Sequence, residues 1–302
     1  MVLSRWLLLV TSSVAALLAV PVSTRLAAQG TEPVQVTTQG GSQPAPSRDG
    51  EWIAFRSGGM IAKIRPDGTE PTLLVAGIDP NWNRPGDLII FGDYSLRLFT
   101  VNATTRETTH VWTGSNASTG RCDHPVWSPV ADEIAVSAPA LTLVHYPYGP
   151  AAPVACGCSD MQDATWSPDG QWIGFDTQDI FRVPRAGGAP EQVVGGPRSQ
   201  RFPSWSPDGR FIAYSEDFVP VPPPDLGYPR NIWVVDARGE AFGKTQVTFG
   251  NFNDAYPAWS PDGGTIYFDS DRSGRTEIWK VAFDSVVPVR ASTWGRLKTL
   301  YR

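Results

Sequence analysis

The chain has 302 residues and a formal net charge of -5. Such an acidic chain lacks the basic face that the phosphates of a nucleic acid require, so nucleic-acid binding is excluded as the expected function. Only 18% of the residues are charged, whereas 29 are glycine and 28 are proline. This composition is typical of many short strands joined by tight turns, and the length is compatible with one domain or two.

The first 29 residues differ in composition from the rest of the chain. Arg5 precedes an apolar run from Trp6 to Val20, and small residues follow up to Gln29. This order predicts a secretory signal peptide over residues 1–29, so we expect a periplasmic or secreted mature protein without a membrane span. The apolar run is shorter than the roughly 20 residues that cross a bilayer, and an uncleaved anchor is the alternative.

A tryptophan block recurs along residues 30–302. Its full form, Trp-Ser-Pro-Asp-Gly, begins at Trp166, Trp205 and Trp259, and shortened or altered copies lie upstream. From Trp127 onward the tryptophans are spaced by 39, 39 and 54 residues. Six copies are recognisable, at Ser47-Arg48-Asp49-Gly50, which lacks the tryptophan, and at Trp82, Trp127, Trp166, Trp205 and Trp259. A fixed period of this kind predicts stacked structural repeats.

Each block is followed by sequence typical of strands. A run of β-branched and aromatic residues such as 211–214 comes first, and a second run alternates apolar with other residues. A weaker third run closes most units, and the stretch before the tryptophan supplies a fourth strand. Units of roughly 40 residues without a helical period predict an all-β fold, a six-bladed β-propeller with four antiparallel strands per blade over residues 30–302. We expect the tryptophans to form apolar core between the blades.

The two ends of the chain must meet to close such a ring. Residues 34–37 read Val-Gln-Val-Thr and resemble residues 245–248 at the end of the fifth unit. We therefore expect the N-terminal strand to complete the last blade. Residues 288–293 are the other candidate for that position.

Three cysteines lie in the third unit and in its connection to the fourth. In an exported protein a disulfide is expected, and we predict that Cys122 pairs with Cys158 and that Cys156 is unpaired. The alternative is a zinc or copper(I) site formed by these sulfurs and His124, although the spacing matches no standard metal knuckle. We therefore expect no metal and no cofactor.

Loops at one end of a propeller converge around its central opening. At this upper end lie the loops that lead into each first strand and those between the second and third strands, and their residues are mostly acidic. We predict a binding site for a protein or peptide there. Its predicted residues are Asp123, His124, Asp163, Asp176, Asp179, Arg201, Asp217, Tyr228, Asp254, Asp271 and Arg272. A solvated rim without a function and a calcium site are the alternatives.

The fifth unit carries an insert at residues 218–230 that contains five prolines and Tyr228. Such sequence favours extended backbone with few hydrogen bonds. It predicts either an arm that projects over the upper end or a stiff surface loop.

No set of catalytic residues is recognisable in the sequence. The chain contains neither the Gly-x-Ser-x-Gly nucleophile elbow nor the His-Glu-x-x-His metal motif. Its three histidines, His110, His124 and His145, are scattered over the second and third units. We therefore expect a protein without catalytic residues. A metal-dependent lyase or hydrolase that acts on a polymer at the central funnel is the alternative.

The sixth unit resembles the repeat of TolB-type periplasmic proteins. Residues 254–263 read Asp-Ala-Tyr-Pro-Ala-Trp-Ser-Pro-Asp-Gly, and Ile-Tyr-Phe and Ser-Asp-Arg-Ser-Gly follow. The resemblance covers about residues 33–292 and implies an envelope adaptor or scaffold that binds a protein partner. The same blades occur in peptidase propellers and in some polysaccharide lyases, so the repeat does not specify an activity.

The chain also departs from the TolB pattern. TolB carries an α/β domain before its propeller, whereas only the signal segment precedes the first unit here, so contacts made through that domain are not implied. The turns of the first three units are altered, and we expect that side of the ring to be looser or specialised.

Overall fold

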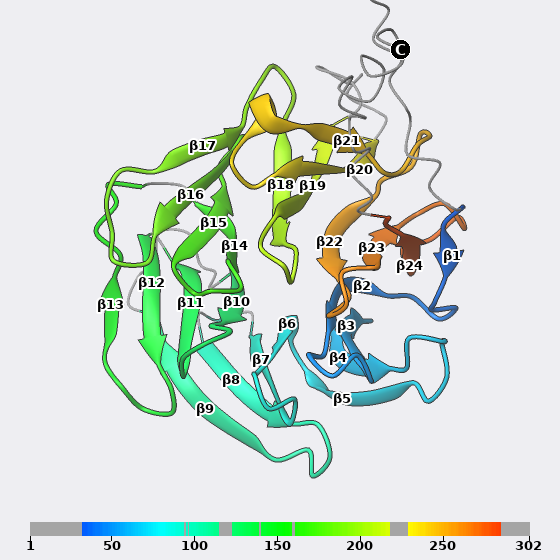
Figure 1. Ribbon diagram of the computed structural model, residues 1–302. Coiled ribbons are helices and arrows are strands. Elements are labelled where there is room, and N and C mark those ends of the chain that lie inside the picture. The colour runs from blue at the N-terminus through cyan, green and yellow to red at the C-terminus, as the bar shows by residue number, and fades with distance from the viewer. Residues whose placement is uncertain are drawn as a thin grey trace, which may run out of the picture.

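The computed structural model describes residues 32–93, 95, 97–114, 123–138, 140–158, 161–217 and 229–284. They form six four-stranded antiparallel sheets arranged in a ring, as Figure 1 shows, which confirms the predicted six-bladed β-propeller. The predicted signal peptide, residues 1–29, lies outside the described residues. Within the described ranges, no helix is long and apolar enough to cross a membrane.

The strands follow the chain blade by blade. Blade one contains β2 (Ser42–Pro46), β3 (Ile53–Ser57), β4 (Met60–Ile64) and β5 (Thr72–Ala76). Blade two contains β6 (Ile78–Trp82), β7 (Leu88–Gly92), β8 (Arg97–Asn102) and β9 (Thr108–Thr113). Blade three contains β10 (Asp123–Trp127), β11 (Glu133–Ala138), β12 (Ala140–His145) and β13 (Ala151–Pro153).

The second half of the ring has the same plan. Blade four contains β14 (Gln162–Trp166), β15 (Trp172–Asp176), β16 (Ile180–Pro184) and β17 (Glu191–Val194). Blade five contains β18 (Gln200–Trp205), β19 (Phe211–Asp217), β20 (Arg230–Asp236), the 3-10 turn η1 (Glu240–Phe242) and β21 (Lys244–Gln246). Blade six contains β22 (Ala255–Trp259), β23 (Thr265–Ser270), β24 (Glu277–Ala282) and the N-terminal strand β1 (Val34–Gln35).

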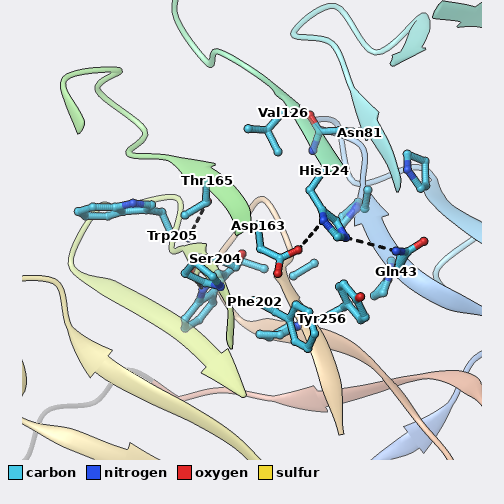
Figure 2. A pocket seen from close by; sticks show the side chains of 18 of the residues that line it. Gln43, Asn81, His124, Val126, Asp163, Thr165, Phe202, Ser204, Trp205 and Tyr256 are labelled. Carbon is cyan, nitrogen blue, oxygen red and sulfur yellow. Dashed lines mark hydrogen bonds and ion pairs between the residues drawn. The ribbon is translucent and has the colours of Figure 1, made fainter. Parts of the chain in front are cut away.

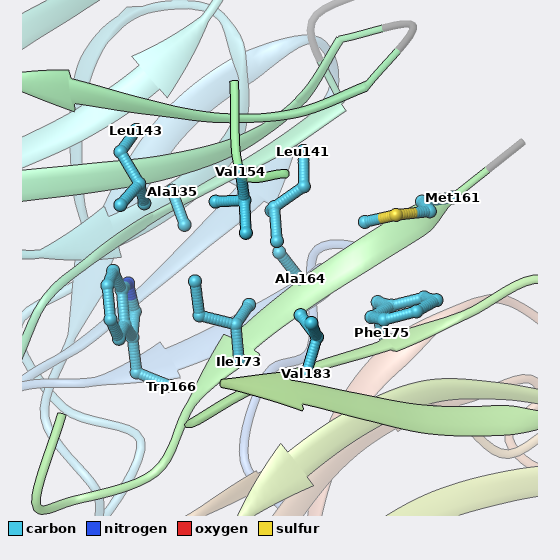
Figure 3. Packing of buried hydrophobic residues seen from close by; sticks show 10 residues of the cluster. All are labelled: Ala135, Leu141, Leu143, Val154, Met161, Ala164, Trp166, Ile173, Phe175 and Val183. Carbon is cyan, nitrogen blue, oxygen red and sulfur yellow. The ribbon is translucent and has the colours of Figure 1, made fainter. Parts of the chain in front are cut away.

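The tryptophans of the repeat pack between neighbouring blades, as predicted. Their exposed fractions are only 6–9%, for Trp82, Trp127, Trp166, Trp205 and Trp259. Trp166 of blade four lies in one apolar cluster with Ile173 of its own blade and Leu143 of blade three (Figure 3). Its indole nitrogen donates a hydrogen bond to the Val126 carbonyl of blade three, at 3.2 Å. Each such indole therefore adds a polar contact to the apolar core between two blades.

The Ser-Pro-Asp-Gly turn is held by its serine. In blade six the Ser260 hydroxyl donates to Asp262 at 2.5 Å and accepts the Thr265 backbone N–H at 2.9 Å. Gly263 follows with φ of 72°, a conformation that a side chain disfavours. In blade two the altered turn uses Asn83, whose side-chain oxygen accepts three backbone N–H groups. The turn of blade two is thus held by a different side chain.

The N-terminal strand closes the ring, as predicted. Strand β1 pairs antiparallel with β24 at the edge of blade six (Figure 1). Next to it the Thr37 hydroxyl donates to the buried Glu277 carboxylate at 2.6 Å and accepts the Ile278 N–H at 2.8 Å. The other candidate, residues 288–293, lies outside the described residues.

The disulfide prediction is wrong. Cys158 is bonded to Cys156, in the connection between β13 and β14, so neither the Cys122–Cys158 pair nor an unpaired Cys156 is present. Gly157 between them has φ of 64°, and this local reversal places the two Cα atoms 5.2 Å apart, within the usual range for a disulfide. The bond also removes both sulfurs as thiolate ligands of the alternative metal site. Cys122 lies outside the described residues.

Replacing Ser260 by Ala should lower the free energy of unfolding by about 1–2 kcal/mol, because it removes one hydrogen-bond donor and one acceptor from the turn. The Ser260 hydrogen bond lowers the pKa of Asp262, so this part of the stability is lost as the pH falls through the lowered pKa. Urea unfolding near neutral pH measures the loss. Ser273→Ala is the matched control, since the exposed Ser273 hydroxyl donates to the Arg275 carbonyl. Equal losses in both variants would contradict the assignment.

Candidate functional site

One residue of each innermost strand points into the central channel. It lies three positions before the tryptophan of the block, or before Pro46 in blade one, and its φ lies between 44° and 59°. We call these side chains the ring residues. They are Gln43, Asp79, His124, Asp163, Phe202 and Tyr256. Positive φ is uncommon outside glycine, so its recurrence at one position indicates a backbone feature shared by all blades.

A β-bulge produces this conformation. Proline follows the ring residue in five of the six blades and cannot donate an N–H to the neighbouring strand. In every blade the pairing register shifts across these two residues, as between Asp123 and Val126 in β10. The bulge leaves both residues unpaired and turns the first toward the channel axis.

Polar ring residues form a chain of contacts around His124 (Figure 2). Its Nδ1 lies 2.5 Å from Asp163 Oδ1, and its Nε2 lies 3.2 Å from Asp79 Oδ1. The Gln43 amide donates to the same Asp79 oxygen. Both carboxylates are buried, with 5% of each residue exposed. Because both ring nitrogens face carboxylate oxygens, the geometry suits an imidazolium that donates two hydrogen bonds.

Aromatic ring residues fill the other side of the axis. The rings of Phe202 and Tyr256 are stacked with centroids 3.9 Å apart. Tyr256 also stacks on His124 at 5.4 Å, although these residues come from blades six and three, on opposite sides of the ring. The Gln43 side chain donates a hydrogen bond to the Tyr256 hydroxyl. The ring residues therefore meet on the axis and occupy the channel at this level.

A cavity lies next to the ring residues, toward the end of the molecule that carries the Ser-Pro-Asp-Gly turns. We call this the turn end and the cavity the chamber. Its volume is about 280 Å³. Its walls include the small side chains two positions after each ring residue, which are Ala45, Asn81, Val126, Thr165, Ser204 and Ala258. A second hollow of about 450 Å³, lined largely by the turns, shares Asn81, Val126 and Thr165 with the chamber and leads toward the turn end.

Two further carboxyl groups are buried behind the ring residues. Asp269 accepts the Gln43 backbone N–H at 3.0 Å, and burial raises the pKa of Asp269 to about 8. Asp176 lies behind Phe202, whose N–H approaches it at 3.4 Å. Burial, and next the nearby Asp163 carboxylate, raise the pKa of Asp176 well above its ordinary value. Acidic groups thus converge on the channel in an environment with little compensating positive charge.

The structure brings His124, Asp163 and Asp176 of the predicted binding residues together at the channel. Several others form pairs on the upper rim. Asp254 binds Arg272 at 2.7 Å, and Asp217 binds Arg230 at 3.0 Å.

The remaining predicted residues are separate from one another. Asp271 accepts the Asn253 backbone N–H at 2.9 Å, and Asp179 accepts from the Gln192 amide at 2.8 Å. Arg201 donates to Ser199 at 3.1 Å and to Gln162 at 3.3 Å. Asp123 is the first residue of β10. Tyr228 and the rest of residues 218–228 lie outside the described residues.

The predicted binding residues do not include four of the ring residues, which are Gln43, Asp79, Phe202 and Tyr256. Alignment of the six blocks on their tryptophans would have identified them, because they occupy the same position as His124 and Asp163. The sequence prediction grouped residues by loop, and this obscured the shared position. In the part of the chain that the structure describes, no group of three or more His, Cys, Asp or Glu residues is arranged to hold a metal ion.

Comparison with known proteins gives the fold a context. No protein-family model matches the chain. A stretch of 54 residues is 41% identical to an uncharacterized protein of Agrobacterium fabrum, and it covers 17% of this chain and 18% of that protein. The match therefore spans about a fifth of the relative's length.

Similar solved structures include a putative TolB from Agrobacterium tumefaciens, with a TM-score of 0.55 and 22% identity over 67% of this chain and 73% of that chain. The hydrazine synthase of Kuenenia stuttgartiensis has a TM-score of 0.61 and 18% identity over 90% and 85%. An oligogalacturonate lyase from Vibrio parahaemolyticus has a TM-score of 0.53 and 12% identity over 84% and 92%. These likenesses show the fold alone. A TolB-like fold is therefore found in proteins of different activities.

Asp269→Asn should remove a pH dependence from the free energy of unfolding. The pKa of Asp269 is about 8 in the folded protein against an ordinary 3.8, so the folded protein retains a proton that the unfolded chain releases. The stabilisation from this proton is present below the ordinary pKa and falls by about 1.4 kcal/mol per pH unit as the pH rises toward the raised pKa.

Urea unfolding of the wild type and of Asp269→Asn at several pH values measures this effect. Asparagine keeps an oxygen that can accept the Gln43 N–H, so the comparison isolates the charge. We expect the variant to gain stability relative to the wild type with each step in pH. A constant difference between about pH 5 and about pH 8 would show that Asp269 ionises normally.

Proposed function

We propose that this protein is an exported propeller that binds a protein or peptide partner at its upper end and performs no chemistry of its own, as a TolB-like envelope adaptor or scaffold. The likeness to the putative TolB from Agrobacterium tumefaciens supports this reading of the fold. The loop before β22 carries the proposal, because it presents exposed aromatic side chains on a fixed backbone.

Two phenylalanines of this loop face solvent. Phe249 is 54% exposed and Phe252 is 37% exposed. Large aromatic side chains are over-represented among the residues that dominate binding energy at protein interfaces. The Arg272 guanidinium lies 5.0 Å from the centre of the Phe252 ring, so a charged group borders the apolar surface. We call Phe249 and Phe252 the upper platform.

Backbone and ionic contacts hold the upper platform in place. The Arg230 N–H donates to the Phe252 carbonyl at 2.9 Å, and the Asp254 N–H donates to the Arg230 carbonyl at 3.1 Å. Arg272 contacts both oxygens of the buried Asp254 carboxylate at 2.7 Å. A surface that is ordered before binding loses less conformational entropy on association, which favours affinity.

The contacts of His124 support a binding protein without catalytic residues. Both of its nitrogens face the carboxylates of Asp79 and Asp163. A general base needs a ring nitrogen that can accept a proton from a substrate. In this arrangement both nitrogens are used within the protein.

The double variant Phe249→Ala/Phe252→Ala should lose most of its capacity to retain an envelope partner. Immobilised wild-type protein and the variant are incubated with an envelope fraction, and the retained proteins are identified by mass spectrometry. Truncation of central aromatic side chains costs about 2 kcal/mol or more each at interfaces, so retention should fall at least tenfold. The identified partner is then purified and its affinity for both proteins is measured directly.

Phe242→Ala is the matched control, because Phe242 is 59% exposed but lies between β20 and β21, at the turn end. It should retain the partner as the wild type does. Equal affinity of the purified partner for the wild type and for the double variant would refute binding at the upper platform.

A lyase that acts on an acidic polysaccharide is the second candidate. The likeness to the oligogalacturonate lyase from Vibrio parahaemolyticus and the presence of His124 in the channel favour it. Under the proposed function, the wild type should release no unsaturated uronate from oligogalacturonate, with or without added Mn²⁺, as followed by ultraviolet absorbance. Product release that is abolished by His124→Ala would establish the lyase instead.

A further inference from the structure

We propose that the chamber is a binding site for an organic cation, an alkylammonium or guanidinium group that approaches from the turn end and rests against Asp79, Asp163 and Tyr256. This site is separate from the upper platform, since the ring residues lie between them. The proposal therefore does not depend on the partner-binding function. Its basis is the shape of the chamber, the balance of charge around it and the chemistry of its walls.

The chamber exists because two layers of side chains alternate along the innermost strands. Ring residues are large and meet on the axis, with Phe202 and Tyr256 stacked at 3.9 Å. Two positions later the side chains are small, as at Ala45, Ser204 and Ala258. Alternate residues of a strand face the same side, so both layers face the channel. The step from large to small side chains leaves a cavity of about 280 Å³ whose inner wall is formed by the ring residues.

The charge balance at this inner wall is negative. Two buried carboxylates, Asp79 and Asp163, share the single imidazole of His124. Asp176 and Asp269 lie behind them and have raised pKa values, chiefly because they are buried. A positive group in the chamber would be attracted by this excess of carboxyl groups, and an anion would be repelled.

The positive groups near these carboxyl groups come from the upper side. Arg201 lowers the pKa of Asp176 and Arg230 lowers that of Asp269, but in each case less than burial raises it. Arg230 is also committed to Asp217 at 3.0 Å. The chamber itself has His124 as the cationic residue among its lining side chains. A ligand cation would therefore add charge where the protein supplies little.

The walls also match the hydrogen-bonding needs of an ammonium or guanidinium group. Such groups only donate hydrogen bonds, so they need several acceptors. Oxygen atoms of Asn81, Thr165 and Ser204 line the chamber beside the ring carboxylates. The face of Tyr256 adds an aromatic surface of the kind that attracts cations. Figure 2 shows these side chains around the same space.

The opening at the turn end carries both signs of charge. Arg48 and Arg84 line it on the side of blades one and two. Arg48 donates to the Pro129 carbonyl at 2.9 Å. The turns also carry acidic residues, which are Asp49, Asp87, Asp169, Asp208 and Asp262. The approach is thus mixed in charge, and the selectivity for a cation arises at the inner wall.

Calorimetric titration of the full chain with agmatine, which carries an ammonium and a guanidinium group, tests the proposal. The tripeptide Gly-Arg-Gly is titrated in parallel to distinguish a free cation from a peptide side chain. We expect saturable 1:1 binding of at least one probe, weakened at least tenfold by Asp163→Asn, since a hydrogen bond to a charged group is lost. Binding of agmatine alone assigns the site to small amines, and binding of the tripeptide assigns it to a basic side chain.

Two further variants keep the test sharp. Ala258→Leu fills the small layer without changing any charge, and it should abolish binding while thermal unfolding stays cooperative. Asp208→Asn removes an exposed carboxylate at the turn end, and it should bind as the wild type does. Phe249→Ala/Phe252→Ala should also bind normally, which separates this site from the upper platform.

Three outcomes would overturn the proposal. The first is no saturable binding of either probe. The second is binding that Asp163→Asn and Ala258→Leu leave unchanged. The third is stoichiometric binding of Mn²⁺ or Ca²⁺ that is lost in Asp163→Asn and displaces agmatine, which would make the chamber a metal site.

Discussion

Closure of the ring between β1 and β24 is the constraint on which the rest of this structure depends. The contact between Thr37 and Glu277 joins residues 240 positions apart, so closure costs chain entropy that local turns do not. Close packing accompanies it, because a side chain at Gly41 would lie 2.9 Å from Ile278. Only when the ring is closed do all six innermost strands face one axis, and only then do the ring residues meet.

The site itself follows from a small local feature that is repeated in every blade. Proline after the ring residue removes one N–H from the sheet, the register shifts, and the preceding side chain turns inward. Identity at that one position is free to vary, since the backbone feature does not depend on it. Blades one to four place polar groups such as His124 and Asp163 there, and blades five and six place Phe202 and Tyr256. The channel is therefore ionic on one side and aromatic on the other.

The two ends of the molecule differ in how their charges are arranged. At the upper end Arg272 and Asp254 neutralise each other in a short, partly buried pair, and the surface beside them is apolar at Phe252. Toward the turn end the carboxylates of Asp79 and Asp163 outnumber the single imidazole of His124. Paired charges order a surface for a partner, whereas unbalanced charges in a cavity select a ligand by its sign.

The sequence by itself determined the blades, because the period of the tryptophan block and the turn chemistry of residues such as Ser260 act locally. It also predicted closure by residues 34–37, whose pattern resembles that of another outer strand. Only the tertiary structure decided which residues meet at the axis, because Gln43 and Tyr256 lie more than 200 positions apart. The Cys156–Cys158 disulfide was likewise decided by the local reversal at Gly157, which no spacing rule predicts. Local physics sets the repeat, and closure of the ring sets the site.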